Sequence, residues 1–116
     1  MNWSKHLSKA ETICPCGCGK NDMKPKIISI FENLRARVGE PLHINSGFRC
    51  EKHNKAVGGK KDSQHLLGMA LDINLPKGIP AKEMEGYMEL SGAGGIGRYK
   101  TFCHCDAREG TFRWQG

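Results

Sequence analysis

Two short segments that lie far apart in the sequence carry side chains typical of divalent-metal sites, so a chain that uses both must fold to bring them together. The first segment runs from Ser63 to Asp72 and contains His65, and the second is His104-Cys105-Asp106. The step from His65 to Asp72 lets the histidine leave a loop or tight turn and the aspartate return on the strand that follows. A catalytic zinc usually has three nitrogen or oxygen ligands from the protein and one open position. We therefore expect His65, Asp72 and His104 to hold one zinc ion.

Residues 101–106 alternate in the manner of a β-strand. The two-residue period of a strand predicts that His104 and Asp106 project from one face, and that Cys103 and Cys105 project from the other and pack in the core. A cysteine peptidase is disfavoured for the same reason, because a nucleophile and its base must approach to about 3 Å, whereas neighbouring strand residues face opposite ways.

A series of motifs in the chain resembles the zinc D-alanyl-D-alanine carboxypeptidase family (metallopeptidase family 15, subfamily A), in the same order and over nearly the whole length. The matching segments are Cys14-Pro15-Cys16-Gly17-Cys18-Gly19, Ser46-Gly47-Phe48-Arg49-Cys50, residues 53–59, residues 63–72, Gly95-Ile96-Gly97-Arg98-Tyr99, and residues 104–108 with Trp114. This resemblance implies a hedgehog/DD-peptidase fold. It also implies that Ser46, Arg49 and Ser63 orient the substrate, beside the zinc ligands His65, Asp72 and His104.

Arg49 is a candidate on chemical grounds as well, since a planar guanidinium binds a peptide carboxylate or carbonyl in a fixed geometry. The alternative for Arg49 is a structural salt bridge. We expect it to contact substrate and count it among the catalytic residues.

One position departs from the pattern of the family. Many members have an acidic general base three residues before the last histidine ligand, and this chain has Thr101 there. Asp106 is our first candidate for the base, because it lies two residues beyond His104. In a second register, taken from related peptidases with a His-x-His pair, His104 is the base and Asp106 is the metal ligand.

The resemblance implies a zinc-dependent peptidase that acts on bacterial peptidoglycan, either as a D,D-carboxypeptidase or as an endopeptidase of the endolysin type from a phage or prophage. Its substrate would be a stem peptide or cross-bridge with D-amino acids. The alternative is a non-catalytic, zinc-containing module that binds the cell wall, which Thr101 supports. An open, carboxylate-flanked metal site argues against that alternative, since structural zinc is usually closed by four ligands.

Length and charge limit the remaining possibilities. The 116 residues are expected to form one domain, residues 1–116, and a formal net charge of +6 favours polyanionic partners such as the cell wall. Nucleic acid is not expected, because the basic residues are scattered and no nucleic-acid module is recognisable. No apolar stretch approaches the ~20 residues of a membrane span, and residues 1–6 lack the apolar segment of a secretory signal, so neither feature is expected. We expect a monomer that is made in the cytoplasm and acts on the wall after release or as a virion component.

The pattern of apolar and turn-forming residues predicts an α+β domain with helices packed on a small, mainly antiparallel sheet. One helix is expected from Pro25, with Asp22 as its cap, to Gly39, and a second from Pro80 to Ser91. Strands are expected at about 42–46, 69–74, 95–99, 101–106 and 111–114.

The six cysteines allow two interpretations. Cys14, Cys16 and Cys18 form a cluster with alternate-residue spacing, which is not the C-x2-C spacing of common zinc sites. Either this cluster joins Cys50 in a second, structural metal site, or the thiols are free in a reducing compartment. We favour mostly reduced cysteines.

Overall fold

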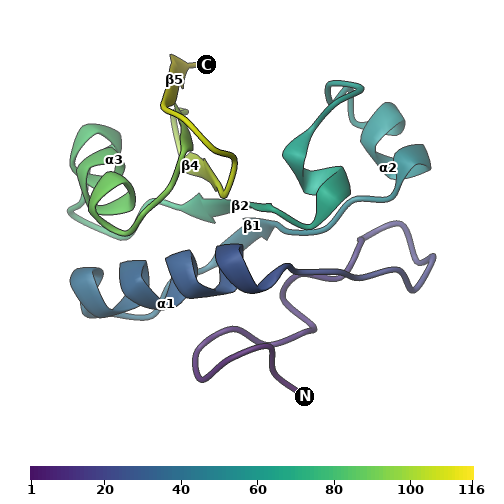
Figure 1. Ribbon diagram of the computed structural model, residues 1–116, viewed down its shortest axis with the longest axis horizontal. Helices are drawn as coiled ribbons and strands as arrows, with labels where there is room; N and C mark the ends of the chain where they lie inside the picture. Colours follow the sequence, from purple (N-terminus) through teal and green to yellow (C-terminus); the bar gives the residue numbers. More distant parts are fainter.

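A five-stranded sheet organises the computed structural model, which describes all residues from 1 to 116 (Figure 1). Its strand order is β1-β2-β4-β3-β5. The strands are β1 (Ile44–Ser46), β2 (Ala70–Asn74), β3 (Gly95–Arg98), β4 (Phe102–Asp106) and β5 (Phe112–Gln115). All neighbouring pairs are antiparallel except β3 and β5, which are parallel. The predicted α+β class with a mainly antiparallel sheet is confirmed.

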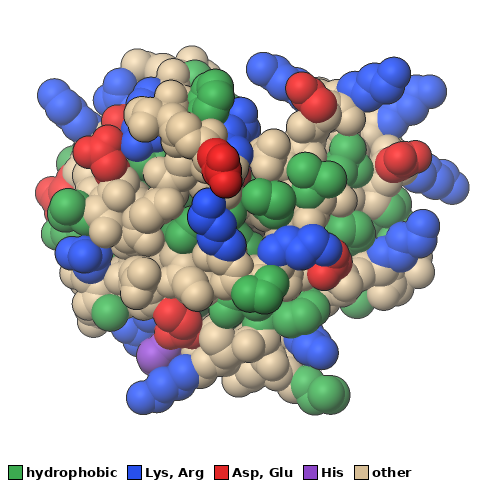
Figure 2. Space-filling model, viewed as in Figure 1, with side chains coloured by type: hydrophobic (Ala, Val, Ile, Leu, Met, Phe, Trp, Pro, Cys, Tyr) green, Lys and Arg blue, Asp and Glu red, His purple; other side chains and the backbone are tan.

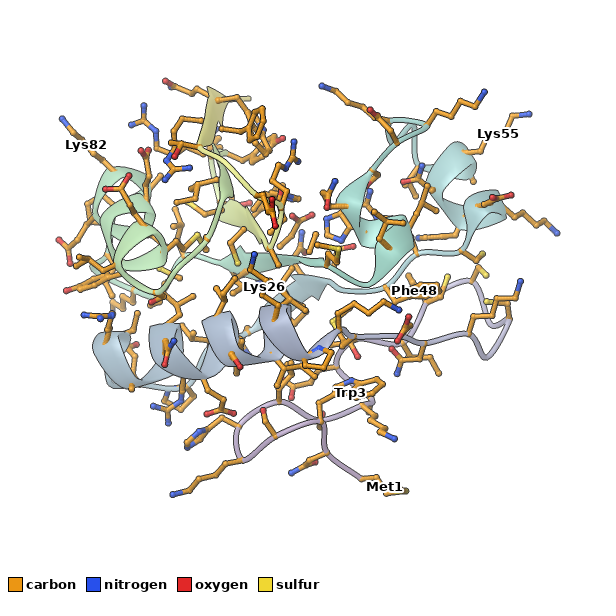
Figure 3. All side chains as sticks on the ribbon, viewed as in Figure 1. Met1, Trp3, Lys26, Phe48, Lys55 and Lys82 are labelled. Atoms are coloured by element: carbon orange, nitrogen blue, oxygen red, sulfur yellow. The ribbon has the colours of Figure 1, made fainter.

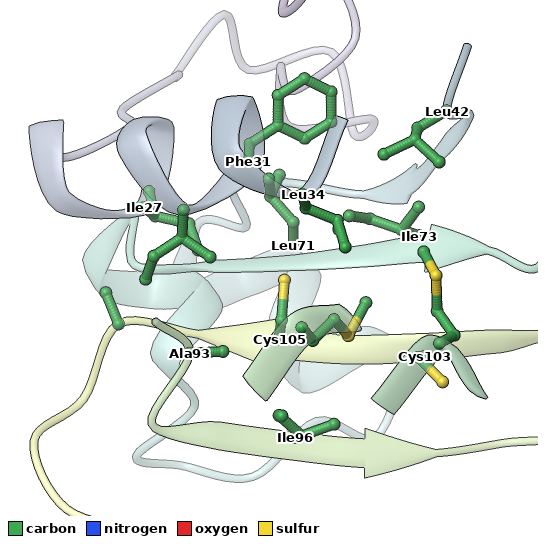
Figure 4. Packing of buried hydrophobic residues seen from close by; sticks show 14 of the residues in the cluster. Ile27, Phe31, Leu34, Leu42, Leu71, Ile73, Ala93, Ile96, Cys103 and Cys105 are labelled. Atoms are coloured by element: carbon green, nitrogen blue, oxygen red, sulfur yellow. The ribbon is translucent and has the colours of Figure 1, made fainter. Parts of the chain in front are cut away.

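The helices α1 (Pro25–Val38) and α3 (Ala81–Leu90) cover one face of this sheet. Figure 4 shows Ile27, Phe31 and Leu34 of α1 above Leu71 and Ile73 of β2, with Cys103 and Cys105 of β4 below them. Both cysteines are fully buried, as the strand alternation predicts. The opposite face of the same strands is thereby left free for the polar side chains.

Helix α1 has the expected extent but not the expected cap. Its N-cap is Lys24, no side chain caps the helix, and Pro25 occupies the first turn. Asp22 lies two residues before the N-cap and pairs with the ammonium group of Lys24 instead. The prediction that Asp22 caps this helix is therefore wrong, and proline in the first turn accounts for the start.

Two short helical segments were not predicted from the sequence. Helix α2 (Glu51–Ala56) follows β1, and the 3₁₀ turn η1 (Gln64–Leu67) precedes β2. Cys50 is the N-cap of α2, and Ser63 is the N-cap of η1. These two segments carry or flank Arg49, Ser63 and His65, so they determine the shape of one side of the candidate site.

Figure 2 shows lysine and arginine side chains projecting around the α2 side of the molecule, at the upper right. Lys52, Lys55, Lys60 and Lys61 are exposed on α2 and the loop that follows it. No helix of the protein combines the length and the apolar character needed to cross a membrane.

Candidate metal centre

Three side chains from separate elements meet on the face of the sheet opposite α1 and α3. Asp72 on β2 is directly paired with His104 on β4, and His65 reaches the same point from η1. Asp72 Oδ1 lies 2.9 Å from His104 Nδ1 and 3.2 Å from His65 Nε2. The three residues are 2–8% exposed, and their ligand atoms all lie within 4.8 Å of one another. The structure thus brings together the three residues that the sequence suggested as ligands.

The second nitrogen of each imidazole has its own acceptor. His65 Nδ1 lies 2.7 Å from the carbonyl oxygen of Gly47, and His104 Nε2 lies 2.7 Å from Asp106 Oδ2. A carbonyl and a carboxylate accept hydrogen bonds, so each of these ring nitrogens donates a proton. In the neutral imidazoles, the lone pairs of His65 Nε2 and His104 Nδ1 then both point toward Asp72 Oδ1. Three electron-rich atoms converge, which requires a positive charge between them.

The protonation behaviour of the cluster follows from that arrangement. Burial alone would raise the pKa of Asp72, but hydrogen bonds with His104 and His65 outweigh it and hold this pKa below its usual range. Burial would lower the pKa of His104, but the carboxylates of Asp106 and Asp72 raise it overall. The cluster therefore favours a cation between these side chains, and without a metal the raised pKa of His104 favours its protonated form.

Asp106 lies behind His104 and does not belong to the cluster. It is fully buried, and its carboxylate accepts hydrogen bonds from Arg108 Nε at 2.9 Å, Arg108 Nη2 at 2.7 Å and the backbone N–H of Gly95 at 3.0 Å. Although burial opposes it, hydrogen bonds with His104 and Arg108 hold the pKa of Asp106 below its usual range. This geometry favours neither of the two roles suggested by the sequence, general base or ligand. It favours a positioning role, in which Asp106 fixes the ring and tautomer of His104.

Arg49 contacts both Asp72 of the metal cluster and Ser46, another residue expected to orient the substrate. Its guanidinium lies 3.4 Å from Asp72 Oδ2, 3.2 Å from Ser46 Oγ and 3.3 Å from Asn54 Oδ1. Both readings of Arg49 therefore have support, since it forms a salt bridge to Asp72 and also lines an open groove. Ser63 Oγ accepts a hydrogen bond from the backbone N–H of His65, so this serine supports the turn that carries His65.

The groove has a volume of about 980 Å³ and lies beside the cluster, not directly over it. Arg49 and Ser63 line it, whereas His65, Asp72 and His104 do not. Basic side chains outnumber acidic ones along its walls, with Lys20, Arg49, Lys52 and Lys61 against Glu51 and Asp62. This composition suits a substrate that carries carboxylates.

Two glycines and a tryptophan complete the site, and sequence reasoning gave them no role. Gly97 is paired with His104 on one side and with Trp114 on the other, and a Cβ at Gly97 would lie 2.3 Å from Trp114 Nε1. The Trp114 ring lies 5.1 Å from the ring of His104. A Cβ at Gly95 would lie 2.3 Å from Asp106 Oδ2. The sequence signal that could have revealed this arrangement is the Gly-Ile-Gly alternation of β3, which places both glycines on the face of the sheet that carries the site.

Comparison with known proteins gives one match. The family model described as Peptidase M15 matches residues 5–106, a range that contains every residue of the cluster. A search of curated proteins finds no match. The family match supports a metallopeptidase, in agreement with a buried group of two histidines and one aspartate that could hold a metal ion. This chain therefore belongs to the peptidase M15 family.

Proposed function

We propose that this protein is a zinc-dependent peptidase that hydrolyses peptide bonds in bacterial peptidoglycan. The observation that carries the proposal is the convergence of His65 Nε2, Asp72 Oδ1 and His104 Nδ1, with the second nitrogen of each histidine fixed by its own acceptor. Two imidazoles and one carboxylate are a ligand set of catalytic zinc, and such histidines usually donate their other N–H to a carboxylate or a backbone carbonyl. The residues present therefore fit zinc.

A zinc ion held by these three residues would polarise the scissile carbonyl and lower the pKa of a water molecule toward neutrality. Around it, Asp106 and the Gly47 carbonyl keep the two imidazole rings in the orientation and tautomer that ligands need. The Trp114 ring packs against the His104 ring and covers one side of it.

Arg49 is placed to orient the substrate. It is only partly buried, lies next to the cluster and also faces the groove, so a carboxylate or carbonyl of the substrate there can accept its N–H groups. Ser46 and Asn54 hold the guanidinium in place. The basic groove suits stem peptides, whose free carboxylates are negatively charged.

A second candidate is a wall-binding module that keeps the metal without catalysis. The observation in its favour is that the cluster contains no free acidic side chain. Thr101 is exposed just before β4, Asp106 is fully engaged behind His104, and Asp72 contacts both histidines and Arg49. A hydrolase with this site would have to remove the proton of the attacking water without a dedicated carboxylate base.

The experiment that separates the two candidates measures soluble fragments released from purified peptidoglycan by mass spectrometry. We expect the zinc-loaded protein to release defined peptides, and a chelated sample and the His65→Ala variant to release none. His43→Ala is the matched control, because His43 is exposed and lies outside the cluster. If no fragment appears although zinc is bound and the protein sediments with the wall, the binding module is favoured. If it neither cleaves nor sediments with any wall type, both candidates fail.

A further inference from the structure

Four cysteines from two distant segments meet in one cluster, and one of them, Cys50, lines the groove. Cys14, Cys16 and Cys18 lie in the N-terminal segment, and Cys50 lies at the start of α2. Figure 3 shows sulfur atoms to the right of the labelled Phe48, between the N-terminal segment and α2. All four cysteines are free thiols, and their Sγ atoms all lie within 4.8 Å of one another.

The separations of the sulfur atoms match a tetrahedral metal site. Three of the sulfurs form a triangle with edges of 3.5 Å (Cys14 to Cys16), 3.7 Å (Cys14 to Cys50) and 3.6 Å (Cys16 to Cys50). Four sulfurs around zinc at the usual bond length of about 2.3 Å are separated by about 3.8 Å. One such distance would also fit ordinary contact between two thiols. Four sulfurs arranged around one point are not explained by pairwise contact.

The backbone around these cysteines also suits a metal site. Three main-chain N–H groups donate to the sulfurs at 3.4 Å, from Cys50 to Cys14, from His53 to Cys50 and from Lys20 to Cys18. Hydrogen bonds of this kind stabilise the thiolate form, which is the form that binds metal.

Two glycines explain how cysteines with alternate-residue spacing can converge on one point. Gly17 and Gly19 have φ angles of +84° and +79°, in the left-handed region that other residues rarely adopt. They reverse the chain on either side of Cys18, so its sulfur can approach those of Cys14 and Cys16. The spacing of a C-x2-C motif is therefore not required here.

We propose that Cys14, Cys16, Cys18 and Cys50 bind a second zinc ion that is structural and closed by four thiolates. A site with four thiolate ligands selects zinc or iron over hard cations and leaves no open position for catalysis. Binding releases the protons of the thiols and adds the binding free energy to the stability of the fold.

This structural site would also support the catalytic one. Cys50 directly follows Arg49, and the segment from Ser46 to Cys50 supplies the Gly47 carbonyl that accepts from His65. The N-terminal segment packs tightly on this loop, because the Phe48 N–H donates to the Thr12 carbonyl at 2.8 Å and a Cβ at Gly47 would lie 2.7 Å from Thr12. A metal that links Cys14, Cys16 and Cys18 to Cys50 fixes that loop.

The test measures metal content and thiolate coordination, and it does not depend on hydrolysis. We expect two zinc ions per chain in the purified protein, one in Cys16→Ser and one in His65→Ala. Cys103→Ala is the matched control and should keep two, since Cys103 is buried in the core outside the cluster. Cys16 is exposed, so its replacement removes a ligand without opening a cavity in the core.

Cobalt substitution identifies the ligands on the unaltered chain. Cobalt bound by four thiolates gives an intense sulfur-to-metal charge-transfer band, which should persist in His65→Ala and disappear in Cys16→Ser. The proposal is overturned if the protein binds only one metal and shows no thiolate band, if Cys16→Ser retains both metals, if iron fills the cysteine site, or if freshly purified protein contains disulfides among these cysteines. If the protein binds two zinc ions but does not cleave peptidoglycan, the proposed peptidase function is refuted and the proposed cysteine zinc site still stands.

Discussion

At the scale of single residues, the candidate site depends as much on absent side chains as on present ones. Asp72, His104, Gly97 and Trp114 follow one another across four strands, and Gly97 leaves the space in which Trp114 approaches His104. Gly95 likewise leaves space for Asp106 and donates its N–H to that carboxylate. Each glycine is therefore needed because a side chain from a neighbouring strand occupies the space of its Cβ. Neither is needed to form a turn.

The positioning role of Asp106 predicts a loss of metal affinity without a loss of the fold. Asp106→Asn keeps the shape of the side chain but removes the charge that fixes the His104 tautomer. We expect zinc affinity to fall roughly 10- to 100-fold, as for other partners of metal-binding histidines. Competition with a chromophoric chelator measures this affinity, and Glu109→Gln is the control because Glu109 is exposed nearby. Equal affinities of Asp106→Asn and the unaltered protein would show that Asp106 does not act through His104.

The sequence pattern predicts which face of the sheet a site residue occupies, but not which residues of the neighbouring strands it contacts. Strand alternation correctly placed His104 and Asp106 on one face and Cys103 and Cys105 on the other. The pattern does not reveal which ring nitrogen faces which carboxylate, because that depends on the register between β2, β4 and β3. The sequence alone therefore leaves Asp106 as a candidate base, and the structure places its carboxylate behind His104.

At the scale of elements, predictability follows length and apolar pattern. The long helix α1 and helix α3 show apolar residues at helical spacing, and the five strands lie within two residues of their expected bounds. Helix α2 spans six residues, of which only Asn54 is buried, and η1 spans four, so neither has an apolar stripe to recognise. Tertiary contacts, not local pattern, determine these two segments.

Two glycines associated with helices should respond to alanine in opposite ways. Gly39 ends α1 with a φ of +78°, whereas Gly86 lies exposed within α3, and a Cβ would contact nothing within 4 Å at either position. Gly39→Ala should therefore destabilise the protein by ~1 kcal/mol through backbone strain. Gly86→Ala should stabilise it by up to ~1 kcal/mol, because alanine has the higher helix propensity. Urea unfolding measures both changes, and effects of the same sign would contradict this account.

At the scale of the whole molecule, the strand order joins segments that are distant in the sequence. Placing β4 between β2 and β3 sets His104 beside Asp72 and leaves β5 to bring Trp114 to the far side. The N-terminal segment lies outside the sheet and contacts the loop before α2 through Thr12 and the cysteines. The sequence predicted one α+β domain and left the approach of the cysteine cluster to Cys50 as one of two interpretations, because the approach involves left-handed turns at Gly17 and Gly19 that the cysteine spacing does not reveal.

The charges of the metal centre predict how the stability of the whole protein depends on pH with and without metal. The pKa values of Asp72 and Asp106 are lowered in the folded state, so their contribution is present above an unfolded value of about 4 and is lost as the pH falls below it. The pKa of His104 is raised, so its contribution is complete below about 6.5 and is lost as the pH rises through the folded value. The metal-free protein should therefore be most stable between about pH 4 and 6.5.

Zinc should move that maximum to higher pH, because it binds the unprotonated imidazoles and competes with the proton on His104. Thermal unfolding of chelated and zinc-loaded protein across this range measures the two profiles. In the metal-free state, His104→Ala should remove the decline above neutral pH, whereas the exposed control His43→Ala should retain it. Superimposable profiles with and without zinc would mean that the proton and the metal do not share this cluster.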